Sequence, residues 1–299
     1  MQNYLQICWM PFMTNSVVYL MIPTKFRRSL IQCWVTMSPL TGKDHILRLS
    51  CFELMNHGNG HGIHFNTKER EPVALDDILN VDWTELLENI HNMRADNWEH
   101  LLNGLKDIKR DISQELGRPK ICLLGRKHFS AAFMFGRVFP SSSGFELETR
   151  QGDSWWTTKC NPIDNELFKL QIVDGSVNSD SLFVEVTATE KLVRDAVRRY
   201  EMKTGINPLL YLRFVPQSGP KLGAVVNNNI CCAMALQIRT SIADILSKEP
   251  IKDIHLFGSM PNGLAMMIGH QMNASFPIQL YEYDGTDYYP SCQLDSMNI

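Results

Sequence analysis

The chain has little excess charge of either sign. It carries 29 Lys and Arg residues against 32 Asp and Glu residues, a formal net charge of -3, and charged residues make up 20% of its 299 positions. Proteins that hold duplex DNA or RNA need a strongly positive surface, because neutralising phosphates drives that binding. The composition therefore excludes broad electrostatic capture of a duplex. Any phosphate-bearing ligand must be held locally.

The short motifs of well-known catalytic sites are also missing. The chain contains no GxxxxGK(S/T) and no GxGxxG after a strand, so a P-loop triphosphatase or a dinucleotide-dependent oxidoreductase is not supported. It has no GxSxG, no HExxH and no CxxC. No catalytic residue emerges from these patterns, which favours a binding module over an enzyme.

The eight cysteines are not spaced as a zinc ribbon. Several lie in apolar runs, where a free Cys behaves as a small hydrophobic residue. His57, His61 and His64 gather near a glycine-rich loop, but no Cys nearby completes a set of four ligands. A solvated hairpin loop is favoured there over a metal site. Free thiols predict a reducing compartment, and thus a cytoplasmic protein without a bound metal.

The N-terminal region has no uninterrupted long apolar run. Residues 4–22 are mostly apolar and basic residues follow them, which resembles a membrane segment with positive flanking charge. Gln6, Pro11 and Asn15 interrupt the run, however. An N-terminal tail over residues 1–35, with an extra strand at 17–22, is favoured, and a membrane span is the alternative. The basic residues follow the apolar run, so a secretory signal is not indicated.

The sequence does contain one pattern twice. Residues 254–289 read as an apolar strand, a turn, an amphipathic helix and a second strand with an aromatic end. Moving back 133 positions without a gap brings Gly258 onto Gly125 and Gly269 onto Gly136, and two tyrosines onto two tryptophans. Two copies are too few for a solenoid. The repeat therefore predicts a duplicated α/β unit whose halves pack together.

Strands and helices alternate around the two copies. Strands are expected at residues 45–54, 120–124, 144–149, 182–186 and 209–214, and helices at 129–138 and 190–203. One or two more helices are expected between residues 83 and 116, with an apolar stripe that ends at Leu116. The polar segment 174–180 is the predicted join. This order predicts an α/β fold with mostly parallel sheets, its first half at 36–175 and its second at 176–299.

The turns that follow the strands are the predicted binding positions. Ligands of open parallel sheets collect outside the carboxyl ends of the strands, where helix N-termini present unpaired N–H groups. We expect the loops 125–129, 258–262 and 215–221 to meet at that edge. Their basic and neutral donors fit a phosphate-bearing ligand, whereas solvated loop charges at Arg126 and Lys127 are the open alternative.

Three segments carry a resemblance to a known family. Residues 254–294, IHLFGSMPNGLAMMIGHQMN and then FPIQLYEYDGTDYYPSCQL, resemble the closing signature of the SAVED domain. That signature has a small-residue turn, a P-x-x-(L/A)-A-x-x-(I/L)-G helix and a P-(I/V)-x-L-Y-E strand. LFVEVTATEKLVRDAVRRY at 182–200 and GRKHFSAAFMFGRVFPSSSGFELETRQGDSWW at 125–156 resemble the same family. The likeness covers about residues 36–299.

The resemblance implies two fused, pseudo-symmetric CARF-like Rossmann units, which agrees with the repeat. It implies a sensor of bacterial antiphage immunity, of the CBASS or type III CRISPR kind, that binds a cyclic oligonucleotide such as a cyclic tri- or tetra-adenylate in the groove between its halves. Binding in such domains drives head-to-tail assembly, which activates an effector. Residues 1–35 are too short for a fused nuclease, TIR NADase or protease. A stand-alone sensor with a separate partner, a fragment of a longer effector and a membrane-type effector are the three expectations.

Ligand contact is carried over by resemblance to the turn after the signature strand, to its first-half equivalents and to three further residues. These positions are Gly258, Ser259, Met260, Pro261 and Asn262, then Arg126, Lys127, His128 and Phe129, and finally Lys221, Gln217 and Tyr281. Donors there would bind phosphates, and His128 or Phe129 would flank a base. A ring-cleaving phosphodiesterase assisted by His128 or His255 is one alternative, and a membrane-disrupting effector that uses residues 4–22 is another. No cofactor is implied.

Overall fold

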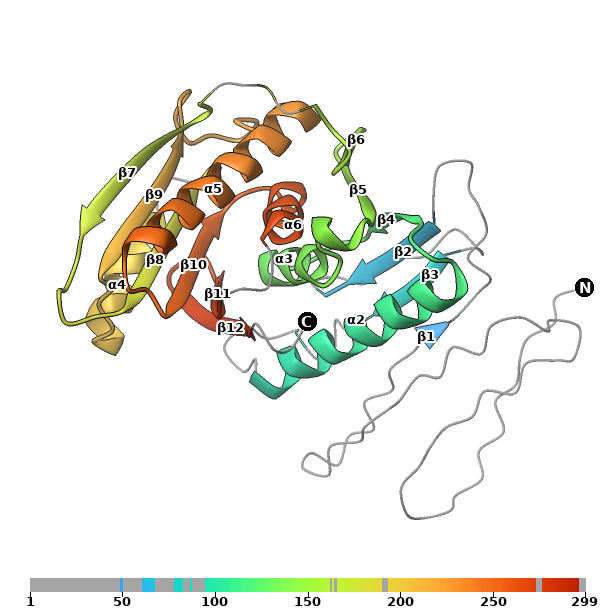
Figure 1. Ribbon diagram of the computed structural model, residues 1–299, viewed down its shortest axis with the longest axis horizontal. Helices are drawn as coiled ribbons and strands as arrows, with labels where there is room; N and C mark the ends of the chain where they lie inside the picture. The colour runs from blue at the N-terminus through green and yellow to red at the C-terminus, as the bar shows by residue number, and fades with distance from the viewer. Residues whose placement is uncertain are drawn as a thin grey trace, which may run out of the picture.

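Two six-stranded sheets face each other across a layer of helices (Figure 1). This computed structural model describes residues 49–50, 61–67, 78–82, 87, 95–161, 163, 166–189, 193–272 and 276–295. The expectations for the N-terminal tail, including residues 4–22, lie outside these ranges. So does most of the strand expected at 45–54.

The first sheet holds its parallel strands at the centre. Its order is β1 (Leu49–Ser50), β3 (Ile78–Asp82), β2 (His61–Asn66), β4 (Lys120–Leu124), β5 (Glu146–Gln151) and β6 (Ser154–Thr157). The strands from β3 to β5 are parallel, and β1 and β6 are antiparallel edges. The predicted hairpin loop at His61 and His64 is wrong, because both residues lie in β2 and pair with β4.

The second sheet repeats this scheme. Its order is β7 (Phe168–Asp174), β9 (Leu210–Pro216), β8 (Ser181–Thr187), β10 (Asp253–Ser259), β11 (Ile278–Tyr283) and β12 (Tyr288–Leu294). The central four strands are again parallel, and β7 and β12 are antiparallel edges. Both sheets thus share one strand order and one pattern of directions. The predicted α/β fold with mostly parallel sheets is confirmed.

The chain changes sheets before the polar segment that we expected to be the join. β7 already pairs with β9 of the second sheet, its last residue is Asp174, and residues 175–180 form the turn between β7 and β8. The N–H groups of Gly175 and Ser176 donate to the carbonyl groups of Leu209 and Pro208, both at 2.8 Å, which holds this turn against the start of β9. The crossing between sheets therefore falls between β6 and β7.

Helices fill the space between the sheets and cover one outer face. They are α2 (Ala95–Glu115), α3 (Phe129–Val138), α4 (Val193–Thr204), α5 (Asn228–Lys248) and α6 (Asn262–Gln271), with a short 3-10 turn, η2 (Ser141–Ser143). Leu101, Leu105 and Ile112 form the buried stripe of α2, as periodicity predicts. Leu116 lies beyond the last turn and is 40% exposed, so the stripe ends earlier than expected.

Helices α3 and α6 come from the two copies of the repeat and cross at glycines. A Cβ atom on Gly136 would lie 2.0 Å from the carbonyl oxygen of Met266, and one on Gly269 would lie 2.1 Å from that of Phe133. The backbones of the two helices are therefore in direct contact at this crossing, because neither glycine has a side chain to separate them. Gly136 and Phe133 occupy the same places in the first copy as Gly269 and Met266 in the second.

The ends of the two crossing helices are tied to each other as well. Arg137 donates from Nη1 to the carbonyl oxygen of Met272, which is the C-cap of α6. His270 bonds through Nδ1 to the carbonyl oxygen of Phe139, the C-cap of α3, at 2.5 Å. Each helix thus supplies a side chain to the orphaned carbonyl at the end of the other. Burial lowers the pKa of Arg137 to about 10, which leaves it charged at neutral pH.

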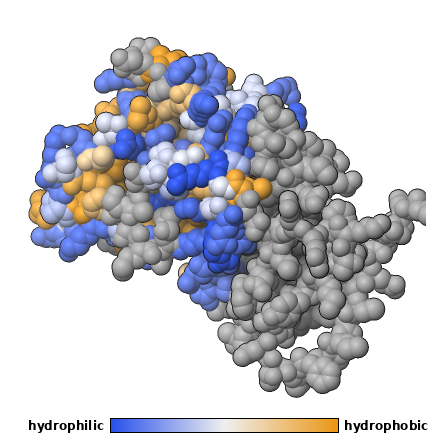
Figure 2. All heavy atoms as spheres, turned by 45° about the vertical axis from the view of Figure 1, so that its right-hand side comes forward, coloured by the Kyte–Doolittle hydropathy of each residue, from blue (hydrophilic) through white to orange (hydrophobic). Residues whose placement is uncertain are grey.

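One continuous apolar core runs through both sheets and the four helices α2, α3, α5 and α6. A second cluster lies on the far face of the second sheet, where Phe183, Phe257 and Tyr281 pack beneath Val197 and Tyr200 of α4. Of the described surface, the face in Figure 2 mixes hydrophilic and hydrophobic residues. Helix α5 is long and apolar enough to span a membrane, yet eight of its residues are buried in the protein, which is typical of a core helix.

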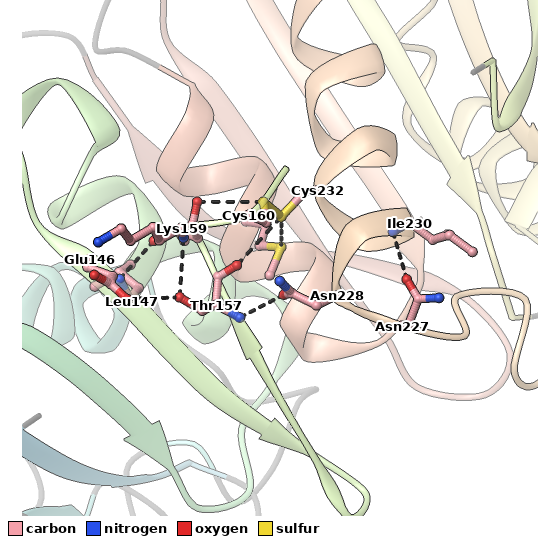
Figure 3. Close-up of a disulfide and its surroundings, with 11 residues drawn as sticks. Glu146, Leu147, Thr157, Lys159, Cys160, Asn227, Asn228, Ile230 and Cys232 are labelled. Atoms are coloured by element: carbon pink, nitrogen blue, oxygen red, sulfur yellow. Dashed lines mark hydrogen bonds between the residues drawn. A yellow bond between two sulfur atoms is a disulfide. The ribbon is translucent and has the colours of Figure 1, made fainter. Parts of the chain in front are cut away.

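A disulfide joins the segment after β6 to helix α5. Cys160 and Cys232 are bonded 72 positions apart, beside Thr157, whose N–H donates to Asn228 at 2.7 Å (Figure 3). The expectation of free thiols is therefore wrong for these two cysteines, because folding brings together residues far apart in sequence. On the chain-entropy account, closing a loop of this length stabilises the fold by about 4 kcal/mol.

Candidate functional site

The turns that follow β4 and β10 lie against each other at the carboxyl edges of the two sheets. The side-chain amide of Asn262 donates to the carbonyl oxygen of Lys127 at 2.9 Å, which joins the second turn to the first. A Cβ atom on Gly258 would lie 3.2 Å from the ring of Phe129, so that ring rests on the glycine backbone. The two predicted turns therefore lie next to each other.

The first turn is held from within by residues that we expected to face a ligand. Gly125 has a φ of 80°, a left-handed conformation that favours glycine. Lys127 is 5% exposed, and its ammonium group donates to the carbonyl oxygens of Leu124 at 3.0 Å and Gly125 at 2.6 Å. This buried cation satisfies the carbonyl end of β4. Arg126 is the exposed residue of the turn.

His128 and Phe129 are buried as well. The hydroxyl of Thr67 accepts from the N–H of His128 at 2.8 Å and lies 3.0 Å from its Nδ1, and Trp98 contacts the imidazole edge to face. Thr67 directly follows β2, and its own N–H donates to the carbonyl oxygen of Arg126 at 2.9 Å. The end of the neighbouring strand therefore fixes the first turn.

The second turn is fixed in the same manner but stays more open. The N–H groups of Ala188 and Thr189, just after β8, donate to the carbonyl oxygen of Ser259 at 2.8 and 2.9 Å. The hydroxyls of Thr189 and Ser259 lie 2.8 Å apart. Ser259, Met260, Pro261 and Asn262 are all half-buried. Small polar groups therefore line the second turn, where the first turn has a buried cation.

The N-terminus of α3 is already occupied by a carboxylate of the other half. Glu282 of β11 is 4% exposed, and its Oε1 accepts from the N–H of Ser130 at 2.6 Å. The hydroxyl of Ser130 also lies 2.6 Å from that of Ser291 on β12. An anion at this end of a helix is stabilised by the unpaired N–H groups and the helix dipole. This N–H group is therefore engaged by the protein itself, contrary to our expectation that it would face a ligand.

The loop after β9 reaches the same edge. The N–H of Lys221 donates at 3.1 Å to the carbonyl oxygen of Ala188, the residue whose own N–H donates to Ser259. The N–H of Gln217 donates to the carbonyl oxygen of Leu167 at 2.8 Å. The side chains of Lys221 and Gln217 are both exposed.

Tyr281 lies apart from the other predicted residues. It is 1% exposed in the cluster beneath α4, where its hydroxyl lies 2.5 Å from Nδ1 of His255 and 3.0 Å from the hydroxyl of Tyr200. Burial, helped by the Tyr200 hydrogen bond, raises the pKa of Tyr281. His255 is 8% exposed, and burial lowers its pKa. Neither side chain opens onto the edge that carries the two turns.

Sequence reasoning missed Thr67, Thr189 and Glu282. The two threonines follow the strands that neighbour β4 and β10. The strand order places them beside the two turns, and the sequence alone does not give that order. Glu282 sits in the recognised Tyr-Glu strand ending, yet its bond to a helix of the other half depends on how the halves pack. Among the described residues no group of three or more His, Cys, Asp or Glu side chains could hold a metal ion.

The fold and this edge define a sensor-type α/β domain, and the chain belongs to the SAVED family. Residues 105–294 match the SMODS-associated and fused to various effectors sensor domain. CD-NTase-associated protein 4 from Moraxella osloensis is 22% identical over 203 residues, which cover 67% of this chain and 42% of that protein. The protein of the same name from an Acinetobacter strain is also 22% identical, over 204 residues with the same coverage.

Solved structures share the fold. The Cap4 SAVED/CARF-domain containing receptor of Acinetobacter baumannii, determined with the cyclic trinucleotide 3′3′3′-cAAA, matches with a TM-score of 0.63 at 20% identity, covering 77% of this chain and 51% of that one. The Moraxella osloensis Cap4 receptor matches with a TM-score of 0.58 at 18% identity, covering 78% and 49%. The chain thus spans about half the length of these relatives.

Proposed function

We propose that this chain is a receptor for a cyclic oligonucleotide of the cyclic tri- or tetra-adenylate type, bound where the turns after β4 and β10 meet. The contact between these turns, made by Asn262 and Lys127, carries the proposal. It places donors from both halves at one edge, where ligands of parallel sheets collect. A solved relative with the same fold holds 3′3′3′-cAAA, and another structure of that receptor holds 2′3′3′-cAAA.

The exposed and half-buried residues of the edge are assigned to the ligand. Arg126 and Lys221 would neutralise phosphates, because guanidinium and ammonium groups pair well with phosphate oxygens. The hydroxyls of Ser259 and Thr189 and the amide of Asn262 would complete the polar contacts. Lys127, His128 and Phe129 are assigned to holding the first turn, since each is nine-tenths or more buried.

We further infer that the chain is built from two pseudo-symmetric CARF-like units. The shared strand order of the two sheets supports this, and so does the crossing of α3 and α6 at equivalent glycines. A ring-shaped ligand with repeated nucleotides suits a site to which two related units contribute. One unit would bind each side of the ring.

Ligand binding would then drive head-to-tail assembly and activate an antiphage effector, in cis or in trans, in a CBASS or type III CRISPR setting. We also propose that this receptor is cytoplasmic. Light scattering with and without ligand tests assembly, and a mass that stays constant at saturating ligand would refute it.

A ligand panel tests binding itself. Cyclic di-, tri- and tetranucleotides are titrated into the full chain by calorimetry and by thermal shift, because a ligand that binds the native state raises the melting temperature. We expect a cyclic tri- or tetra-adenylate to bind and the linear triadenylate to bind more weakly. No binding across the panel would remove the proposal. Chromatography after incubation should return the ring intact, whereas a cleaved ring would favour the phosphodiesterase.

A further inference from the structure

A cavity lies on the far face of the second sheet, beside the first turn of α4. Its volume is about 290 Å³, and its walls come from β7, β8, β9, the loop after β9 and α4. Five of its lining residues are polar, namely Gln171, Glu185, Thr187, Arg194 and Arg213. Phe183, two residues before Glu185 on β8, packs beneath α4. Strand alternation therefore points Glu185 away from the α5 and α6 side of the sheet.

The strand register explains how these side chains meet. Arg213 of β9 pairs with Gln171 of β7 on one side and with Glu185 of β8 on the other. Directly paired residues project from the same face with their Cβ atoms close together. The three side chains thus form one row across the floor of the cavity, and Arg194 stands at its rim.

The row contains an ion pair between two buried residues whose remaining polar atoms face the cavity and are not sealed inside the protein. Glu185 is 2% exposed and Arg213 is 8% exposed, and the guanidinium donates only through Nε, to Oε1 of Glu185 at 3.0 Å. Its other close contact is the ring of Tyr211, 4.8 Å away. Among the residues that the structure describes, the two terminal nitrogens of Arg213 and the second oxygen of Glu185 make no hydrogen bond. In a bidentate ion pair one of those nitrogens would also donate to the carboxylate. In this pair both terminal nitrogens remain available to a ligand.

The charges and the size of the cavity define what would fit. Two guanidinium groups and one carboxylate line the cavity. Burial raises the pKa of Glu185, whereas Arg213 and Arg194 lower it, and the nearby carboxylate of Glu201 raises it. An anion with several oxygens would satisfy Arg213 and Arg194, and a hydroxyl or amino group beside it would satisfy Glu185. The volume lies at the lower end of small-molecule sites. A whole cyclic trinucleotide is too large for it.

We propose that this cavity is a second ligand site, for a small phosphate monoester of about the size of one nucleotide. The phosphate binds the terminal nitrogens of Arg213 and the guanidinium of Arg194, and a donor of the ligand binds Glu185. The site opens on the α4 face of the sheet and has its own set of polar residues, while Val215 and Pro220 in its wall belong to the loop that brings Lys221 to the proposed edge.

Calorimetry on the full chain tests this with adenosine 5′-monophosphate as the probe and with inorganic phosphate and adenosine as the two arms. The monophosphate should bind, phosphate should bind more weakly, and adenosine should not bind. Arg194→Gln should weaken monophosphate binding about tenfold, the usual loss for one charge-assisted hydrogen bond. Arg198→Gln, which removes an exposed arginine from the same helix, should leave it unchanged. Equal losses in the two variants would overturn the proposal.

Two further measurements keep this site distinct from the proposed edge. Arg213→Lys keeps the positive charge but removes the two terminal guanidinium nitrogens. It should weaken binding of the monophosphate more than Arg194→Gln does. Circular dichroism checks that the variant is folded. A saturating cyclic triadenylate should leave monophosphate binding unchanged. Displacement of the monophosphate would place it at the edge and refute the second site. If the chain binds no cyclic nucleotide at all, the calorimetry with the monophosphate still decides the question.

Discussion

The two copies of the repeat agree where α3 and α6 pack together and differ at the turns that precede these helices. At the crossing of α3 and α6, both copies keep a glycine, a donor side chain and an accepting C-cap carbonyl in the same places. At the turns, the first copy has Arg126, Lys127 and His128, while the second has Ser259, Met260 and Pro261. Shared packing constrains the two copies alike, but the turns have no such common constraint.

The difference at the turns has a physical basis. The first turn buries a lysine beneath its own carbonyl groups and receives Glu282 at the helix that follows. The second has no buried cation and relies on hydroxyl and backbone contacts. Two turns of different chemistry on either side of a cyclic ligand would hold that ligand in a single orientation. The proposed contacts with the ligand therefore differ between the two turns and do not follow from symmetry.

The largest effect should come from filling the helix crossing. Gly136→Ala and Gly269→Ala each bring a methyl group onto a backbone oxygen that cannot turn aside, so α3 and α6 must separate. We expect each to lower the free energy of unfolding by about 3 kcal/mol, measured by urea denaturation. Gly263→Ala is the comparison in the same helix, because its Cβ would meet a side chain, the ring of Trp156, and not a backbone oxygen. It should cost about 1 kcal/mol, and unequal costs at the two crossing glycines would argue against equivalent packing.

The paired donors at the helix ends should respond differently to pH. Burial lowers the pKa of His270, whereas the pKa of Arg137 remains far above neutrality. Below the ordinary histidine pKa of about 6.5, the unfolded chain takes up a proton that native His270 resists, so stability is present above that pH and is lost as the pH falls. The loss can reach about 1.4 kcal/mol per pH unit for each such histidine. His255, whose pKa burial also lowers, contributes in the same direction.

The His270→Gln variant isolates this contribution. Its free energy of unfolding should fall less steeply than that of the parent chain between about pH 7 and pH 5.5. His100→Gln, which changes an exposed histidine on α2, is the matched control for the loss of one imidazole. Parallel curves for the parent and the His270 variant would mean that His270 does not titrate with folding.

Local sequence signals were enough to place the repeat. The bounds predicted for the helix at 129–138 coincide with α3, and α6 has the same length 133 positions later, because turn glycines and apolar spacing mark both ends. The sheet edges were harder. β7 was assigned to the first half, since a polar turn follows it and nothing nearby shows that it pairs with β9, 35 or more positions on.

The site was harder to predict than the fold for a similar reason. Arg126 and Lys127 look alike in the sequence, yet one is exposed and the other is buried beneath the end of its own strand. His128 is fixed by Thr67, 61 positions earlier, and α3 is capped by Glu282, 152 positions later. Contacts of such separation depend on strand order and on the packing of the halves. Periodicity and motif spacing do not report them.

Adjacent residues of the first turn provide the next test. Arg126→Gln should weaken a bound cyclic triadenylate about tenfold through loss of one charge-assisted contact, and should cost less stability than the change at Lys127. Lys127→Met should instead lower the free energy of unfolding by about 2 kcal/mol, because two strand-end carbonyls lose their donor. Calorimetry and thermal unfolding of both variants separate the roles. An unstable Arg126→Gln variant or a stable Lys127→Met variant would reverse the assignment.

The smallest effect on ligand binding is expected at Tyr281, which lies on the α4 side of the second sheet and not at the turns. Tyr281→Phe removes a hydroxyl that bonds to His255 and Tyr200, so it should cost about 1 kcal/mol of stability, the usual net value of a hydrogen bond. Its affinity for a cyclic triadenylate should match that of the parent chain. Ser259→Ala, at the open turn, should show the opposite pattern of lower affinity with nearly unchanged stability. If Tyr281→Phe loses affinity as Ser259→Ala does, the far face of the sheet takes part in ligand binding. The packed regions and the ligand-facing regions of the molecule would then not be separate.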